Sequence, residues 1–277
     1  MKADLHIHTY FSDSDQSPEK IAALAREKRL DYISVCDHDV ITAYPRLIAA
    51  CAKEGVKLIQ GVEIDVHWNK QWLHLLAYDF DPESEIMLRL LSKSKLEIYE
   101  LNDDLIRNMS VDFPQLSMAE YEIYQYRRER GGFNAINYIY DKGLSENPID
   151  SMKYVNIYNH YTPNFPEMSK TCQIIKAAGG IPILAHPGKW WEDEVGSRSV
   201  TAKLMALKTL GLEGVECYHP AHSPAFTQIC VVFCEINDMY ITCGSDCHGN
   251  FFSPSLGVMD IDMENLRLWS GFGTNPL

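Results

Sequence analysis

Segments that predict β-strands alternate along this chain with segments that predict helices, and this alternation restricts the available folds more than any other feature. Apolar runs such as Asp31–Cys36 and Ile181–Ala185 are separated by amphipathic stretches. One such stretch, 17–29, opens with Ser17 and Pro18, which are typical of a helix start. This succession predicts parallel strands joined by crossover helices, and in such sheets binding sites lie at the carboxyl ends of the strands.

Nearly every predicted strand is followed by a side chain that can ligate a metal ion. At the start of the chain, His6 and His8 lie on the same side of an extended segment, so both can reach one ion. Scattered core histidines have no reason to gather at strand ends, so the whole set predicts a metal site. The candidate ligands are His6, His8, Asp13, His38, Glu63, His74, His186, Asp246 and His248.

The segment from Glu63 to Tyr78 predicts a β-hairpin. A turn near Trp68 and Asn69 would place Glu63 opposite His74 on one face of the hairpin. The two side chains would then be available to the same group of ions.

A different pattern follows the hairpin. Residues 83–108 and 117–142 read as helical, and prolines interrupt the chain after them. We therefore expect an α/β fold in which 1–82 and 166–277 form the barrel with the metal site. Residues 83–165 would be an inserted helical subdomain, placed so that it could cover the site as a lid.

Charge and hydropathy exclude several functions. The 277 residues carry a net charge of −13, which argues against stable binding to duplex nucleic acid or to an anionic membrane surface. There is no apolar run long enough to span a bilayer and no signal-peptide pattern, so we expect a cytoplasmic protein.

The eight cysteines admit two interpretations. Their spacings fit a tetrathiolate zinc site poorly, because none forms a C-x-x-C pair. Most have apolar neighbours, as in Ile229–Cys234, which favours reduced and buried cysteines.

The candidate ligands are imidazoles and carboxylates, a mixture that suits manganese, iron or zinc. Nine ligands are too many for one ion but sufficient for two or three divalent ions that share a carboxylate. Clustered divalent ions suit the hydrolysis of phosphate esters, because they lower the pKa of a bound water and neutralise charge on the phosphoryl oxygens. An acidic chain can therefore still bind a phosphorylated small molecule or a short oligonucleotide.

Five short motifs, in this order, resemble the motif series of the PHP (polymerase and histidinol phosphatase) superfamily. They are His6-x-His8, Asp37-His38-Asp39, Gly61-Val62-Glu63, Ala185-His186-Pro187 and Ser245-Asp246-x-His248. The resemblance covers about 1–80 and 170–257. It implies a distorted (β/α)7 barrel, a trinuclear metal site and a metal-dependent phosphoesterase activity.

The resemblance also implies how the ligands are shared among three ions. His6, His8, Glu63 and Asp246 would hold the first, Glu63 with His74 and His186 the second, and Asp13, His38 and His248 the third. A metal-bridging hydroxide held by Glu63 and Asp246 would be the nucleophile.

The length and the helical insertion look most like the stand-alone PHP phosphoesterases that act on nucleotides and short oligonucleotides. In that branch we expect an Arg-Pro-His-like segment inside the insertion. The corresponding segment here, 127–134, contains neither proline nor histidine. This departure concerns the substrate and leaves the metal ligands unaffected.

Residues near the motifs are candidates for other roles. Arg127, Arg130, Lys189 and Arg198 are candidates for binding the substrate phosphate. His219 and His222 follow a strand end, and either could protonate the leaving group.

Two alternative functions remain open at this point. An amidohydrolase-type C–N hydrolase also begins with His-x-His, but it would normally use a lysine or an additional histidine as the bridge. A non-catalytic metal-binding regulatory protein would be favoured by a missing ligand, and none is missing here.

Overall fold

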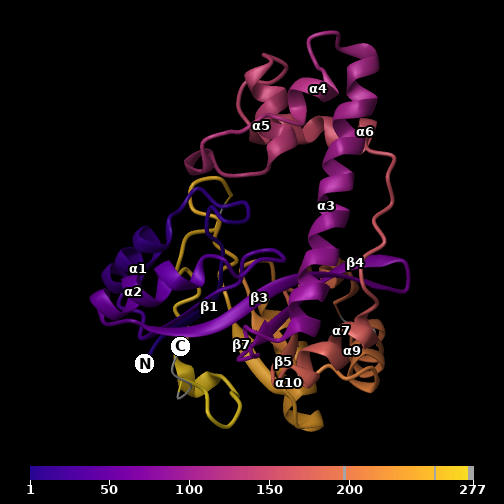
Figure 1. Ribbon diagram of the computed structural model, residues 1–277. Coiled ribbons are helices and arrows are strands. Elements are labelled where there is room, and N and C mark those ends of the chain that lie inside the picture. Colours follow the sequence, from indigo (N-terminus) through magenta and orange to yellow (C-terminus); the bar gives the residue numbers. More distant parts are fainter. Residues whose placement is uncertain (196–197, 253, 274–277) are drawn as a thin grey trace.

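The computed structural model describes residues 1–195, 198–252 and 254–273. Its centre is one sheet of seven strands, which lie in the order in which they occur along the chain (Figure 1). The strands are β1 Ala3–Ile7, β2 Tyr32–Val35, β3 Lys57–Trp68, β4 Gln71–Tyr78, β5 Ile181–Leu184, β6 Gly214–Tyr218 and β7 Tyr240–Cys243.

The sheet curls so that its first and last strands meet. β1, β2 and β3 pair in parallel, as do β5, β6 and β7, whereas β4 is antiparallel to both of its neighbours. At the end of β1, the His8 N–H donates to the Cys247 carbonyl (2.9 Å), and the Asp246 N–H donates to the His6 carbonyl (2.8 Å). The predicted α/β class with a distorted seven-stranded barrel is confirmed.

Helices cover the outside of the barrel (Figure 1). The barrel helices are α1 Pro18–Glu27, α2 Tyr44–Glu54, α7 Met168–Ala177, α8 Gly188–Trp191, α9 Ser199–Thr209 and α10 Pro224–Asn237. The predicted start of α1 is correct: the Ser17 side chain accepts a hydrogen bond from the Lys20 N–H (3.2 Å), and Pro18 occupies the first turn. Buried apolar side chains of these helices and of the strands form the barrel core.

Residues 85–158 contain a further set of helices, the first of which begins against the barrel core through Met87, Leu90 and Leu91. These helices are α3 Glu85–Asp112, α4 Met118–Tyr121, α5 Asn134–Asp141 and α6 Val155–Tyr158, with the 3-10 helices Arg128–Arg130 and Ile149–Tyr154. Figure 1 shows α4, α5 and α6 grouped around the far end of α3, away from the barrel. This group, the helical lobe, has an apolar cluster of its own that includes Leu105, Met109, Tyr121 and Tyr138.

The prediction of a continuous helical stretch over 117–142 is wrong in its middle. Between α4 and α5 the structure has only the 3-10 helix Arg128–Arg130, and both Gly131 and Gly132 adopt positive φ (72° and 70°). Glycine tolerates this backbone conformation, which interrupts a helix. The two glycines also lie against Phe251, where a Cβ atom would collide with the ring.

The hairpin forms as expected, but its register differs from the prediction. Its turn residues are Asn69 and Lys70, both with positive φ (47° and 64°), as in a type I′ turn. This shift places Asp65, not Glu63, opposite His74, and Glu63 is opposite Leu76. Because the shift is two residues, Glu63 and His74 still face the same side of the sheet.

All eight cysteines are buried and free, in agreement with the interpretation of reduced core cysteines. No helix in the described ranges is both long and apolar enough to cross a bilayer.

Candidate metal centre

The nine predicted ligands meet at the carboxyl ends of the strands. His6 lies in β1, Glu63 in β3 and His74 in β4, while the others lie in the loops that follow β1, β2, β5 and β7. Four overlapping groups bring ligand atoms within 4.8 Å of one another, and all nine predicted ligands belong to at least one of them. The groups are His6–His8–Glu63–Asp246, Glu63–His74–His186, His8–Asp13–His38–His248 and His38–Asp65–His74.

The first group is completely buried around one carboxylate oxygen of Glu63. Oε2 of Glu63 lies 3.1 Å from Nε2 of His6 and 3.2 Å from Nε2 of His8. Nε2 of His8 is also 3.1 Å from Nε2 of His6 and 3.1 Å from Oδ1 of Asp246. Ligands bound at about 2.0–2.2 Å to one ion lie about 3 Å from each other, so these separations suit a shared metal.

The second group surrounds the other oxygen of Glu63. Oε1 of Glu63 lies 2.8 Å from Nδ1 of His74 and 2.9 Å from Nε2 of His186. Each oxygen of Glu63 thus faces a different set of imidazoles, which is the arrangement expected of a bridging carboxylate.

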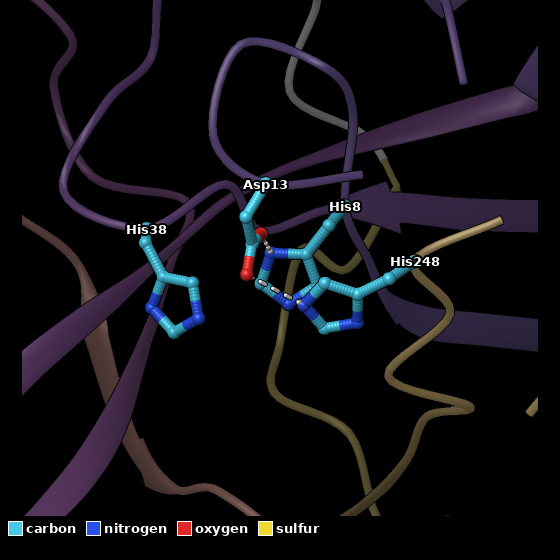
Figure 2. Close-up of side chains that lie close together, drawn as sticks. All are labelled: His8, Asp13, His38 and His248. Atoms are coloured by element: carbon cyan, nitrogen blue, oxygen red, sulfur yellow. Dashed lines mark ion pairs between the residues drawn. The ribbon is translucent and has the colours of Figure 1, made fainter. Parts of the chain in front are cut away.

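The third group lies on the loops after β1, β2 and β7. Figure 2 shows the Asp13 carboxylate beside the stacked rings of His8 and His248, with His38 on its other side. The Asp13 carboxylate is 3.2 Å from Nε2 of His248 and 3.7 Å from Nδ1 of His8. Nε2 of His38 also lies 3.3 Å from Oε2 of Glu63, so this group adjoins the first.

The donor set fits divalent metal ions. Within the described part of the chain, Asp13 Oδ1, Glu63 Oε2 and Asp246 Oδ1 are buried and have no hydrogen-bond partner, although each points into the cluster. Buried carboxylate oxygens without partners are costly unless a cation compensates them. Imidazole and carboxylate ligands without a thiolate suit manganese, iron or zinc.

The imidazoles strongly stabilise the charged form of the central carboxylates. Burial opposes ionisation of Glu63, but His6, His38 and His74 outweigh it and hold the pKa of Glu63 well below its usual range. Asp246 behaves in the same way. Burial raises its pKa, but the nearby His6 and His219 lower the pKa by more, so it is also well below the usual range. Both carboxylates are therefore anionic and available as ligands at neutral pH.

Sequence reasoning missed two buried carboxylates beside the ligands. Oδ1 of Asp65 lies 3.2 Å from Nε2 of His74, and Oε1 of Glu216 lies 3.1 Å from Nδ1 of His6. Asp65 is on the inward face of β3, two residues from Glu63, so correct hairpin pairing would have identified it. Glu216 stands inside the apolar run of β6, where no motif marks it.

A cavity of about 570 Å³ opens over the cluster, and Lys189 and His219 are in its wall. Nζ of Lys189 contacts the Asp246 carboxylate. Burial lowers the pKa of Lys189, but Asp246 and Glu63 outweigh burial, and the net shift is upward. The apolar part of the lining includes Phe252 and Pro254.

The two histidines proposed as acids differ in their environment. Nδ1 of His219 accepts a hydrogen bond from the Ala221 N–H (3.0 Å), so the neutral ring carries its proton on Nε2, 3.7 Å from Oδ2 of Asp246. Both nitrogens of His222 are occupied by backbone groups: Nε2 accepts from the Gly188 N–H (2.9 Å), and Nδ1 donates to the Cys217 carbonyl (2.9 Å). Burial lowers the pKa of His222 to about 4.

The three arginines predicted to bind phosphate are not among the residues that line this cavity. Arg130 pairs with Asp141 (2.7 Å), and Arg127 is largely exposed, 4.0 Å from Glu129. Arg198 is exposed at the start of α9.

Comparisons with known proteins agree with this geometry. A family model described as "PHP domain" matches residues 4–138. A 5'-3' exoribonuclease of Haemophilus influenzae is 25% identical over 264 residues, covering 89% of this chain and 90% of the relative. A 3',5'-nucleoside bisphosphate phosphatase of Chromobacterium violaceum is 20% identical over 272 residues, covering 93% of this chain and 90% of the relative.

A solved structure from Bifidobacterium adolescentis, provisionally described as a metal-dependent phosphoesterase, has the same fold. It superposes with a TM-score of 0.79 at 24% identity, covering 96% of this chain and 92% of that chain.

Proposed function

We propose that this chain, which belongs to the PHP family, hydrolyses phosphate esters with the help of two or three bound divalent metal ions. One observation carries the proposal. Glu63 and Asp246 present buried, unpartnered oxygens to a ring of imidazoles at the floor of an open cavity. That arrangement supports clustered cations directly beneath a substrate.

The nine predicted ligands would hold the ions in the three sets suggested by the resemblance, with Glu63 shared between two of them. When bound, such ions lower the pKa of water and neutralise charge on phosphoryl oxygens. Asp13, His38 and His248 would complete the third set. Manganese, iron and zinc all suit these donors.

The residues of the cavity wall would act on the substrate. Lys189 holds its ammonium group over the site beside Asp246, where it can attract a phosphoryl oxygen. His219 presents an Nε2–H to the same space, so it can donate a hydrogen bond to a phosphoryl or leaving oxygen. We assign no proton transfer to His222, because backbone groups occupy both of its nitrogens.

The substrates of the relatives suggest the class of ester. One relative is named as an exoribonuclease and another as a nucleoside bisphosphate phosphatase. The proposed substrate here is therefore a nucleotide or a short oligonucleotide. Its base would lie beside the apolar side chains of Phe252 and Pro254 in the cavity lining.

Residues 83–165 would form an inserted subdomain beside the mouth of the site. The Gly132 N–H donates to the carbonyl of Asp13 (2.7 Å), which joins the helical lobe to a loop that carries a predicted ligand. Phe251, close to His248, packs against Gly131 and Gly132. These contacts support a lobe that borders the substrate path.

The test is to incubate manganese-loaded protein with a short 5'-phosphorylated RNA and, separately, with a nucleoside 3',5'-bisphosphate. Release of mononucleotides from the RNA would indicate a phosphodiesterase, and release of inorganic phosphate alone would indicate a phosphomonoesterase. The Asp246→Asn variant is the matched control, since it removes one ligand charge. If the wild type released nothing from either substrate or from a generic aryl phosphate with any of the three metals, the proposal would fall.

A further inference from the structure

Glu216 is a completely buried carboxylate on β6 that neither lines the cavity nor belongs to the predicted ligands. Both of its oxygens are engaged with the metal centre. Oε1 lies 3.1 Å from Nδ1 of His6, and Oε2 accepts a hydrogen bond from the backbone N–H of His186 (2.8 Å). One side chain therefore contacts two predicted ligands, one on β1 and one in the loop after β5.

At His6 this contact decides which nitrogen is free to bind a metal. Nε2 of His6 faces Glu63 and Asp246, so Nδ1 is the nitrogen that points away from the centre. A carboxylate at Nδ1 accepts the Nδ1–H and leaves the lone pair on Nε2, toward the ions.

At His186 the contact holds an unusual backbone conformation. His186 has a positive φ of 26°, outside the regions that residues other than glycine normally adopt. This conformation directs Nε2 of His186 to Oε1 of Glu63 (2.9 Å). The hydrogen bond from the His186 N–H to Glu216 fixes the peptide group at this strained position.

The two histidines serve opposite sides of the bridging carboxylate. His6 faces Oε2 of Glu63, and His186 faces Oε1. The space around Glu216 is also closed, because a Cβ atom on Gly244 would lie 2.2 Å from Cβ of His6 and 2.3 Å from Oε1 of Glu216. Gly244 therefore packs directly against both His6 and Glu216.

We propose that Glu216 is a positioning residue that sets the His6 tautomer and the His186 backbone together, so that two metal ions depend on it. The inference rests on the proposed function in one respect, namely that ions occupy the centre. It assigns to Glu216 no contact with the substrate.

The Glu216→Gln variant tests this with little change of shape. Glutamine has one acceptor oxygen, whereas Glu216 serves two donors, the His6 ring and the His186 N–H. If the amide oxygen stays with His186, the NH2 group faces Nδ1 of His6 and favours the tautomer with the proton on Nε2. We expect metal affinity to fall about 10- to 100-fold. In the zinc-loaded wild type, nitrogen-15 NMR should show the His6 ring with a proton on Nδ1 and with Nε2 bound to zinc. In Glu216→Gln this pattern of signals should be lost.

Two further variants keep the test decisive. Glu216→Asp retains two acceptors and should restore part of the affinity, which a purely packing role would not predict. Glu213→Gln removes the same charge just before β6, where Glu213 pairs with Lys176, and should leave metal binding unchanged. Thermal unfolding of each metal-free variant identifies any that fail to fold.

Unchanged metal affinity and an unchanged His6 signal in folded Glu216→Gln would overturn the inference. That outcome differs from failure of the proposed function, in which the wild type would bind metal but hydrolyse no phosphate ester. In that second case the NMR and affinity measurements would still report on Glu216.

Discussion

At the scale of single residues, Glu63 is the residue on which the site depends most. Its two oxygens contact five histidines, His6, His8, His38, His74 and His186, at 2.8–3.3 Å. Among the described residues, Glu63 is the only carboxylate that belongs both to the group with His6, His8 and Asp246 and to the group with His74 and His186. Its replacement should therefore affect more than one ion.

We predict that Glu63→Gln will lower phosphate release by at least about two orders of magnitude, because a bridging charge contributes several kcal/mol. The bound metal per chain, measured by elemental analysis, should fall by more than one ion. The control is again Glu213→Gln, which removes an equal charge outside the site. Loss of only one ion would contradict the bridging role.

A second residue-scale prediction concerns Lys189. It is the only lysine or arginine among the described residues that line the cavity. Lys189→Met should lower kcat/KM for phosphate esters about tenfold, because one charged contact to phosphate is lost. Steady-state kinetics measure this, with the exposed Lys170→Met as the control. Equal kinetics for the two variants would exclude a role for Lys189 in substrate binding.

At the scale of elements, His222 links the end of β6 to the start of α8. Its ring joins the Cys217 carbonyl to the Gly188 N–H, and burial lowers its pKa to about 4. In the unfolded chain the ring has an ordinary pKa of about 6.5. Because the folded pKa is the lower one, the contribution of His222 to stability is complete above about pH 6.5 and is lost as the pH falls toward 4.

We therefore predict that acidification from pH 7 to pH 4 will remove about 2 kcal/mol more unfolding free energy from the wild type than from His222→Gln. Urea unfolding at a series of pH values measures the difference. Parallel pH profiles for the two proteins would show that His222 does not titrate on unfolding.

The elements also show what the sequence could and could not predict. The gathering of the nine side chains was predictable because most of them follow an apolar run, and strand ends meet at one edge of a sheet. Hairpin register was not, because a turn at Asn69–Lys70 and one a residue earlier both fit the pattern. Glu216 was hidden because its carboxylate is buried by partners from β1 and the loop after β5, which no local pattern encodes.

At the scale of the whole molecule, the barrel closes where β1 meets the loop after β7, and the centre lies at that junction. The described residues hold several buried anionic oxygens there without hydrogen-bond partners. Bound cations would therefore stabilise the folded barrel and not the unfolded chain.

We predict that manganese at about 1,000 times its dissociation constant will stabilise the metal-free protein by about 4 kcal/mol. Differential scanning calorimetry measures the corresponding rise in Tm, and magnesium, which prefers oxygen ligands, should give a smaller one. Equal effects of the two ions would indicate a site that does not use the histidines.

The distribution of the ligands along the chain has a consequence for synthesis. The first predicted ligand is His6 and the last is His248, so the proposed centre needs residues that lie far apart in the sequence. A nascent chain on the ribosome has no complete centre until the barrel can close behind residue 248. A fragment that ends before residue 246 lacks both Asp246 and His248, so it could not assemble the proposed centre.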